Sequence, residues 1–280
     1  MEFLVAGTSA VQVGTAKRGP SILGVTHMIL QQFALDGRVA LVTGASRGLG
    51  QAMAIGLAQA GADIACVSLS GDDRQTRGHV EALGRRFLGM QADLADPAQR
   101  VGLVDRVAAH FGRIDILVNN AGSGTRHPPE EYPLADWREL IEVHLMAAFD
   151  LSQQAARHML PQGRGRIINV GSVMCYEAGL NISAYAAAKH GIAGLTKSLA
   201  VSWSGRGIAV NCIAPGYFET DRAPVLKNDP VRGPQILDRI PAGRWGQPSE
   251  LAGLCVFLAS DACQYMHGSV VVVDGGWLAR

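Results

Sequence analysis

Short apolar runs alternate with longer amphipathic segments from residue 39 to the end of the chain. The runs are rich in Val and Ile and are rarely interrupted by polar residues, which is typical of strands buried on both faces. The pattern predicts seven strands, at residues 39–43, 62–69, 87–91, 116–119, 166–171, 208–213 and 270–273. Helical spacing between them predicts helices at residues 48–60, 73–84, 97–111, 137–160, 184–204 and 248–260.

Strands that alternate with helices form a parallel sheet covered on both faces, because each right-handed crossover packs its helix against the sheet. We therefore predict an α/β fold, with a single doubly wound (Rossmann-type) domain and a seven-stranded parallel sheet over residues 28–280. Residues 1–27 contain scattered Gly, Ser and Thr without a sustained period. For this segment we expect a flexible N-terminal extension.

Composition narrows the class of function. The 280 residues carry a net charge of +1 without a basic block, which argues against nucleic acid or an anionic membrane as the main partner. No apolar run approaches the roughly 20 residues that a membrane-spanning helix needs. The five cysteines are scattered and contain no Cys-x-x-Cys pair, and the histidines show no metal-ligand spacing. We expect a cytoplasmic protein without a disulfide framework or a metal site.

A glycine-rich turn follows the first predicted strand and opens the first predicted helix. Here Gly44 allows a sharp turn, Gly48 lets the backbone approach a ligand, and Gly50 lets the helix pack close to the sheet. The free N–H groups of the first helical turn favour a phosphate. The spacing, Thr-Gly-x-x-x-Gly-x-Gly, differs from the commoner dinucleotide fingerprint. The turn predicts a dinucleotide site built from Thr43, Gly44, Ser46, Arg47, Gly48, Leu49 and Gly50.

Ligands of doubly wound sheets bind beyond the carboxyl ends of the strands. After the second strand, Ser68 stands where a strict NAD-binding protein has an acidic residue. We expect a preference for NAD, with NADP as an alternative because Ser68 carries no charge and Arg47 could attract a 2′-phosphate. Asp93 could accept a hydrogen bond from the adenine amino group. Further candidates at the strand ends are Leu94, Asn120, Ala121 and Gly122.

The candidate chemistry lies near the start of the helix predicted at 184–204. Tyr185 and Lys189 are four residues apart and therefore share one helix face. A free tyrosine has a pKa near 10. An ammonium about 4 Å away would favour the phenolate by roughly 4 kcal/mol at an effective dielectric of 20, before desolvation opposes it. Tyr185 could then act as a general acid and base, although an ordinary surface pair has the same spacing.

The order and spacing of these motifs resemble the short-chain dehydrogenase/reductase family over residues 35–280. The likeness includes the glycine turn, the Asn-Asn-Ala-Gly run at 119–122, Ser172 thirteen residues before Tyr185, and Lys189. It implies that Tyr185 exchanges the substrate hydroxyl proton, Ser172 holds the substrate oxygen, and Lys189 lowers the tyrosine pKa and binds the nicotinamide ribose. A hydride would move between substrate and nicotinamide. The likeness also implies that the carboxamide end of the cofactor contacts Pro215, Gly216, Phe218 and Thr220.

One residue departs from the family pattern. His144 occupies the position of the family's fourth catalytic residue, an Asn on the long helix before the fifth strand. That Asn kinks the helix and helps to hold a water that connects the catalytic lysine to solvent. His144 could do the same through a ring nitrogen, the proton could take another route, or His144 could be a packed side chain without a catalytic part. If the departure abolishes turnover, the chain would be a dinucleotide-binding sensor.

Several stretches, notably 236–246 and 274–280, resemble family members that act on sugar acids. The resemblance implies a sugar-acid substrate and, as is common in the family, a homotetramer. Arg126 lies on the loop after the fourth strand and is our candidate partner for the substrate carboxylate, although a solvated loop arginine is the alternative. Reduction of a thioester-carried 3-oxo chain would suit the same catalytic residues. A polar segment at 217–234 is expected to form a lid over the substrate.

Overall fold

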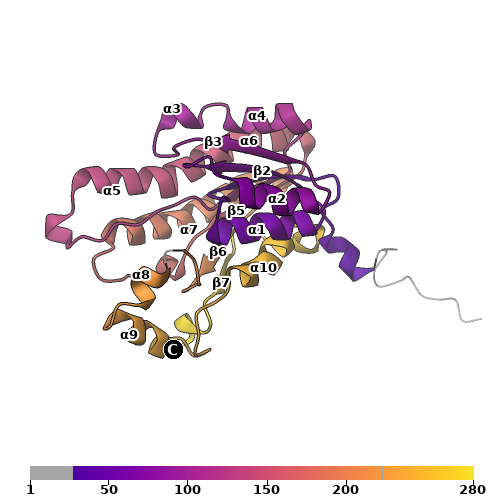
Figure 1. Cartoon of the computed structure of the whole chain (residues 1–280). Coiled ribbons are helices and arrows are strands. Elements are labelled where there is room, and N and C mark those ends of the chain that lie inside the picture. The colour runs from indigo at the N-terminus through magenta and orange to yellow at the C-terminus, as the bar shows by residue number, and fades with distance from the viewer. Residues whose placement is uncertain (1–27, 222) are drawn as a thin grey trace, which may run out of the picture.

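The computed structural model describes residues 28–221 and 223–280, and a seven-stranded parallel sheet forms its centre (Figure 1). The strand order is β3-β2-β1-β4-β5-β6-β7, with every pair parallel. The predicted doubly wound fold is confirmed. The expected extension at 1–27 lies outside the described residues. The strands are β1 (Val39–Thr43), β2 (Asp63–Ser68), β3 (Phe87–Gln91), β4 (Ile116–Asn119), β5 (Gly165–Val170), β6 (Ile208–Pro215) and β7 (Val270–Val273).

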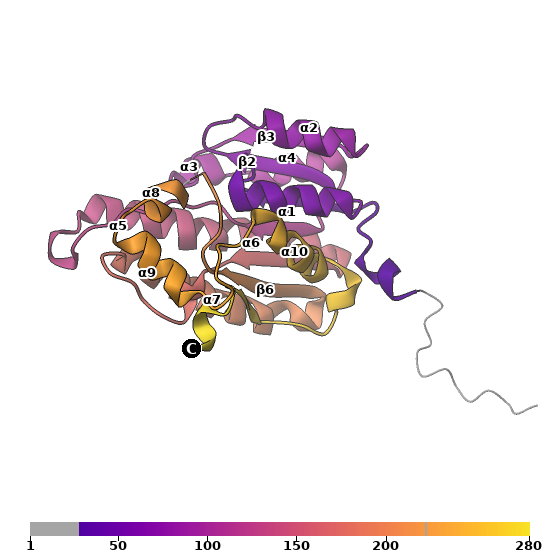
Figure 2. The ribbon, with the colours of Figure 1, turned by 60° about the horizontal axis from the view of Figure 1, so that its bottom comes forward.

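Helices cover both faces of the sheet (Figures 1 and 2). One apolar core joins the sheet to α1 (Gly48–Gln59), α2 (Arg74–Ala82) and α10 (Ala252–Ala259). The other joins it to α4 (Leu103–Phe111), α6 (Ala147–Gln162) and α7 (Ser183–Trp203). The strand order reverses between β1 and β4, and that switch point is where doubly wound sheets open a ligand crevice.

Two helices predicted as continuous are interrupted. The segment at 97–111 is divided into α3 (Pro97–Arg100) and α4, because Gly102 between them adopts a left-handed φ of 69°. The segment at 137–160 begins earlier, with α5 (Leu134–Ile141), and passes through a π-helical turn at Glu142–Met146 before α6. Such π turns occur mostly within longer helices and often at functional sites.

The segment predicted as a lid contains two short helices that the sequence patterns did not predict. They are α8 (Ala223–Lys227) and α9 (Arg232–Arg239), and both views show them on the same side of the molecule as α5 (Figures 1 and 2). Ile236 of α9 packs into an apolar cluster with Trp245 and Trp277. Burial of this helix face holds α9 against the body of the domain.

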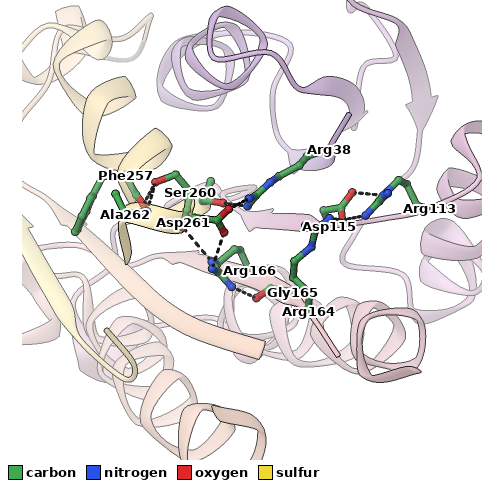
Figure 3. A network of polar contacts seen from close by, with 11 residues as sticks. Arg38, Arg113, Asp115, Arg164, Gly165, Arg166, Phe257, Ser260, Asp261 and Ala262 are labelled. Carbon is green, nitrogen blue, oxygen red and sulfur yellow. Dashed lines mark hydrogen bonds and ion pairs between the residues drawn. The ribbon is translucent and has the colours of Figure 1, made fainter. Parts of the chain in front are cut away.

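Ion pairs lie where the strands begin, at the end of the sheet away from the ligand crevice (Figure 3). Four arginines are paired with two aspartates there: Arg38 and Arg166 with Asp261, and Arg113 and Arg164 with Asp115. Asp115 also accepts a hydrogen bond from the backbone N–H of Val39, at 3.0 Å.

Within the described part of the chain, no helix is long and apolar enough to cross a bilayer.

Candidate active site

The glycine turn after β1 leaves room for a ligand that a side chain would fill. Gly44 and Gly48 adopt φ of 64° and 59°, in the left-handed region that favours glycine. A Cβ on Gly50 would lie 2.3 Å from the carbonyl oxygen of Gly44, so helix α1 can approach the turn only because residue 50 is glycine. A Cβ on Gly48 would touch only Thr220, at 3.7 Å. The turn therefore offers open space beside its backbone.

The side chains of Thr43, at the end of β1, and Asn120, just after β4, join the glycine turn to the loop after β4. The Oγ1 of Thr43 accepts hydrogen bonds from the backbone N–H groups of Asn120 and Ala121, both at 2.9 Å. The amide of Asn120 donates to the carbonyl oxygens of Thr43 and Gly44. The side chains of Thr43 and Asn120 thus shape the crevice floor by binding protein backbone.

The ends of β2 and β3 offer polar groups where an adenosine would lie. Ser68 is buried, and its hydroxyl has no hydrogen-bond partner among the described residues. Asp93 is half-buried and accepts from the backbone N–H of Ala95, while Leu94 is buried beside it. An unsatisfied buried hydroxyl costs free energy, and a ribose hydroxyl would satisfy it. Together with the space at the glycine turn, Ser68 fits a bound dinucleotide.

Arg47 lies exposed at the start of α1. Its guanidinium is 3.7 Å from the carboxylate of Asp221, and both side chains are more than half exposed. An exposed pair of this kind contributes little free energy, so Arg47 can exchange Asp221 for a phosphate. Ser46, beside it, uses its carbonyl oxygen to accept from Gln51, and Leu49 packs against the core.

The residues at and after the end of β6 lie beside the glycine turn, because Thr220 contacts the position of Gly48. Gly216 donates its backbone N–H to the carbonyl oxygen of Val273 and follows the buried Pro215. Phe218 is 7% exposed and its ring packs against Gly246, so its side chain faces the core. Only the backbone of Phe218 is left to contact a cofactor. Thr220 is half-buried and faces Gly48.

The structure brings Ser172, Tyr185 and Lys189 together at the junction of β5 and α7. The hydroxyl of Ser172 accepts from the backbone N–H of Met174 at 3.2 Å and is hydrogen-bonded to the phenol of Tyr185. The ammonium of Lys189 lies 5.5 Å from the centre of the Tyr185 ring. It donates to the carbonyl oxygen of Val170 at 2.6 Å. A substrate hydroxyl could therefore meet both Ser172 and Tyr185.

Burial controls the titration of both catalytic groups. It raises the pKa of the Tyr185 phenol, and the hydrogen bond from Ser172 opposes this only partly. It lowers the pKa of the Lys189 ammonium to about 8. We predicted from the spacing that Lys189 lowers the pKa of Tyr185. Burial, which we expected to oppose that effect, is the largest influence on the Tyr185 pKa, and Lys189 directs its ammonium to the carbonyl oxygen of Val170.

His144 lies in the π-helical turn and packs against the catalytic tyrosine. Its ring meets the ring of Tyr185 edge-on, with centroids 5.2 Å apart, and its Nε2 lies 2.6 Å from the carbonyl oxygen of Ser123. A Cβ on Gly122 would fall 2.1 Å from the imidazole, so Gly122 makes room for His144. A small cavity of about 10 Å³ is lined by both His144 and Lys189. Its size is close to that needed for one water.

Arg126 lies exposed on the loop after β4 and donates to the carbonyl oxygen of Leu180 at 3.2 Å. Partial burial of the guanidinium lowers its pKa, and the nearby charge of Arg232 lowers it further. The sequence patterns did not single out Arg232, which is the first residue of α9. A cation at the start of a helix opposes the helix dipole, and that mismatch was the available signal.

A buried amide network beneath the crevice was also not expected from the sequence. Asn119 donates to the carbonyl oxygen of Ala148, the hydroxyl of Ser152 and the side chain of Asn169. These bonds tie β4 to α6 and β5 just below the site. Among residues 28–221 and 223–280, no group of three or more His, Cys, Asp or Glu side chains is placed to hold a metal ion.

Comparisons with known proteins bear on the same region. A family model described as enoyl-(acyl carrier protein) reductase matches residues 44–278. The chain is 48% identical over 254 residues to 2-dehydro-3-deoxy-D-gluconate 5-dehydrogenase of Escherichia coli (strain K12), which covers 90% of this chain and 100% of the relative. It is 41% identical over 249 residues to gluconate 5-dehydrogenase of Gluconobacter oxydans (strain 621H), covering 87% and 96%.

A solved structure has the same fold. It is a gluconate 5-dehydrogenase from Burkholderia cenocepacia J2315, in complex with NADP and tartrate. Its TM-score to this chain is 0.86 at 40% identity, and the match covers 90% of this chain and 100% of that one.

Proposed function

Because the chain belongs to the short-chain dehydrogenase/reductase family, and is thus an NAD(P)-dependent oxidoreductase that acts on CH–OH groups, we propose that its substrate is a sugar acid oxidised at C5. The favoured substrate is 2-dehydro-3-deoxy-D-gluconate. The observation that carries this proposal is the 48% identity to the Escherichia coli enzyme of that name over its full length. The arrangement of Ser172, Tyr185 and Lys189 supplies the groups that the reaction needs.

Each catalytic side chain has a role that its contacts support. Ser172 donates a hydrogen bond to the substrate oxygen and aligns it with the phenol of Tyr185. Tyr185 exchanges the hydroxyl proton at its phenolic oxygen, accepting it when the C5 hydroxyl is oxidised and returning it when the ketone is reduced. Its raised pKa favours the protonated phenol, which is the form that donates in the reduction direction. Lys189 has its ammonium 5.5 Å from the centre of the tyrosine ring, and with a pKa of about 8 it can exchange a proton with Tyr185 through a bound water or hydroxyl. A bound nicotinamide supplies or accepts the hydride.

We assign His144 a positioning role. Its contacts with Tyr185 and with Ser123 connect the catalytic ring to the loop after β4. The cavity that His144 shares with Lys189 could hold the water that the family's Asn holds. Both observations support His144 as a substitute for that Asn, with the π-helical turn providing the kink.

The nicotinamide cofactor would be held by the residues of the crevice, from the glycine turn to Thr220. We propose NAD as the preferred form, because the buried hydroxyl of Ser68 lacks a hydrogen-bond partner that a ribose hydroxyl would supply. NADP is the alternative, supported by the NADP bound in the Burkholderia cenocepacia structure. Arg47 would then be the partner of the 2′-phosphate.

Gluconate is the second candidate substrate, because gluconate 5-dehydrogenases share 40–41% identity with this chain over nearly their whole length. Reduction of a 3-oxoacyl thioester is the alternative outside sugar acids, and the match to a family model described as enoyl-(acyl carrier protein) reductase is a reason to test it. The non-catalytic sensor is set aside, since the family assignment and the intact catalytic residues make the chain an enzyme.

The experiment is dinucleotide-dependent turnover of 2-dehydro-3-deoxy-D-gluconate, D-gluconate and a 3-oxoacyl thioester. We expect the highest kcat/KM with the first substrate. Tyr185→Phe should lower kcat by about 10²- to 10⁴-fold while cofactor affinity, measured by fluorescence titration, stays the same. Near-full activity of the variant would contradict the assignment of the chemistry to α7. A higher kcat/KM with the thioester would replace the sugar acid as substrate.

We further propose a cytoplasmic homotetramer. All five cysteines are buried free thiols, which suits a reducing compartment. Strand β7, at the edge of the sheet, consists of four valines that stay half-buried, and association would cover them. Light scattering on the purified protein measures the number of subunits directly.

A further inference from the structure

Arg100, the last residue of α3, is a buried cation that binds three oxygens from separate parts of the chain. Only 4% of the residue is exposed. Its Nη1 donates to the carbonyl oxygen of Leu94 at 2.8 Å and to Oε2 of Glu142 at 3.0 Å. Its Nε donates to Oδ2 of Asp150, also at 3.0 Å. Charge-assisted hydrogen bonds of this kind are strong and directional, so Arg100 ties the residues after β3 to the helical segment that runs from α5 to α6.

The two acids that Arg100 binds bracket the π-helical turn. Glu142 is the first residue of that turn, and Asp150 lies in the first turn of α6. Eight steps of a regular α-helix rotate by about 800°, which would leave the two side chains about 80° apart around the axis. A π turn contains about one residue more, because its hydrogen bonds run from i to i+5. Eight steps that include it rotate by roughly 700°, as seven α-helical steps do, and return to nearly the same face. One guanidinium can therefore bind both acids because the π turn lies between them.

The same turn presents His144 to the catalytic tyrosine. The imidazole meets the ring of Tyr185 edge-on, with centroids 5.2 Å apart. A shift of the turn by one residue would rotate His144 by about 100° around the helix axis, and the contact with Tyr185 would be lost. The hydrogen bond from Arg100 to Glu142 fixes the first residue of the turn and opposes such a shift.

The bond from Arg100 to Leu94 reaches the cavity beside the catalytic lysine. Leu94 lines that cavity of about 10 Å³ together with His144 and Lys189. One guanidinium thus holds two walls of a space whose size is close to that needed for one water. The position of such a water depends on both walls.

We propose that Arg100 is a positioning residue, which holds the π turn in the register that places His144 against Tyr185. The inference rests on the positioning role proposed above for His144. A buried ion pair often adds little net stability, because the cost of desolvation offsets the attraction between the charges. Placing the turn is therefore a better reason than stability for a charge at this point between α3 and α6.

The test removes all three charges together, so that no buried acid is left without its partner. The variant Arg100→Met/Glu142→Gln/Asp150→Asn keeps side chains of similar size and loses the charged link. We expect its crystal structure to show a shifted turn, with the rings of His144 and Tyr185 beyond the roughly 7 Å of an aromatic contact. The kcat with 2-dehydro-3-deoxy-D-gluconate and NAD should fall by about 10- to 100-fold. KM for NAD should change less than about twofold, because the turn does not contribute to ground-state binding.

Arg38→Met is the matched control. Arg38 is also a buried arginine, and it donates to the carbonyl oxygen of Ala259 and to the carboxylate of Asp261. Its removal leaves Asp261 paired with Arg166, and the site lies where the strands begin. We expect kcat to stay within about twofold of the unmodified protein even where the Tm falls, because the two sites are distant from each other. A drop in kcat as large as that of the triple variant would overturn the proposal.

Adding His144→Ala to the triple variant shows whether Arg100 acts through His144. We expect His144→Ala to lower kcat much less there than in the unmodified protein, because both changes remove the same contact. Fully additive losses would show that Arg100 acts by another route and would overturn the proposal.

The crystal structure needs no substrate, so it separates this inference from the proposed function. If the contact of His144 with Tyr185 is lost in the triple variant but neither that variant nor His144→Ala lowers kcat, Arg100 places the turn and the proposed role of His144 fails. If His144→Ala lowers kcat while the triple variant keeps both the contact and its activity, the role of His144 stands and the inference about Arg100 fails. A protein that oxidises no sugar acid but loses the contact in the triple variant supports Arg100 and contradicts the proposed substrate.

Discussion

Lys189 is a buried cation at the centre of the site. It is 4% exposed, and burial lowers the pKa of its ammonium to about 8 from an ordinary value of 10.5. Below pH 8 the lysine is charged in both the folded and the unfolded chain, so the folded state bears the full cost of desolvation. Between pH 8 and 10 the unfolded chain binds more protons, and the free energy of unfolding therefore rises with pH.

Lys189→Met should lack this rise. From pH 7 to 9.5, we expect the unfolding free energy of the unmodified protein to gain about 2 kcal/mol relative to that of the variant. Above pH 10 the raised pKa of Tyr185 acts in the opposite direction, which limits the window. Urea unfolding of both proteins at pH 7, 8.5 and 9.5 measures the difference. Parallel curves would show that the ammonium is better solvated than its burial indicates.

Ser68 allows a test of cofactor choice. Ser68→Asp places a negative charge at the end of β2, where it would repel a 2′-phosphate. We expect the ratio of kcat/KM for NAD to that for NADP to rise by about tenfold or more, with Ser68→Ala as the uncharged control. An unchanged ratio would mean that the phosphate lies elsewhere. A strong NADP preference of the unmodified protein would contradict the proposed NAD preference and make Arg47 the phosphate partner.

The catalytic residues could be predicted from a helix spacing together with a family resemblance. Tyr185 and Lys189 share a helix face, but an ordinary surface pair has the same spacing, so it was the resemblance to the family that joined them with Ser172 in one predicted site. The pKa of Tyr185 could not be predicted in the same way, because its burial comes from Tyr217, Trp245 and other residues far away in the sequence. Arg232 was not predicted as a site residue for the same reason, because only the folded chain brings α9 near Arg126.

At the level of elements, glycines set how closely α1 and α10 approach. A Cβ on Gly56 of α1 would lie 2.7 Å from the Cβ of Ala252, whereas a Cβ on Gly253 of α10 would meet nothing within 4 Å. Gly56→Ala should therefore destabilise the protein by about 1–3 kcal/mol. Gly253→Ala should stabilise it by up to about 1 kcal/mol, because alanine favours the helix. Urea midpoints compare the two variants, and equal effects would contradict this account of the packing.

The strands were predicted closely because buried parallel strands are unbroken apolar runs with polar or glycine residues at both ends. The helix interruptions were not. Gly102 could have been accommodated in a helix at a modest cost, and the turn at His144 depends on contacts with Tyr185 and the loop after β4. Helices α8 and α9 have only five and eight residues, so their stability comes from packing in the apolar cluster of Trp245 and Trp277 rather than from local preference.

In the whole molecule, the ion pairs that stabilise the sheet lie where the strands begin, and the candidate site lies where the strands end. Near the strand starts, Asp115 and Asp261 are each paired with two arginines, and these ion pairs tie neighbouring segments together (Figure 3). At the other end the turns keep open space and an unsatisfied hydroxyl. We infer that substrate range is set there.

The first residues of the described chain contribute little to the folded domain. Met28, Ile29 and Leu30 are 65–75% exposed, and the short helix Ile29–Phe33 has no buried residue. Packing starts with Phe33, whose ring lies 6.1 Å from that of Phe257, and with the fully buried Leu35. The complete Escherichia coli relative is matched by 90% of this chain. We therefore propose that residues 1–27 are dispensable.

A chain that begins at Met28 should keep its Tm within about 2 °C, since a loss of 1 kcal/mol would shift the Tm of a domain this size by roughly 2–4 °C. Its kcat/KM should stay within about twofold, and its subunit number should not change. A chain that begins at Leu35 is the matched control, because it also loses the contact between Phe33 and Phe257 and should melt several degrees lower. Calorimetry, kinetics and light scattering on the three chains test this directly. A large drop in Tm on removing residues 1–27 alone would show that they contribute to the fold, and a loss of subunits would show that they contribute to assembly.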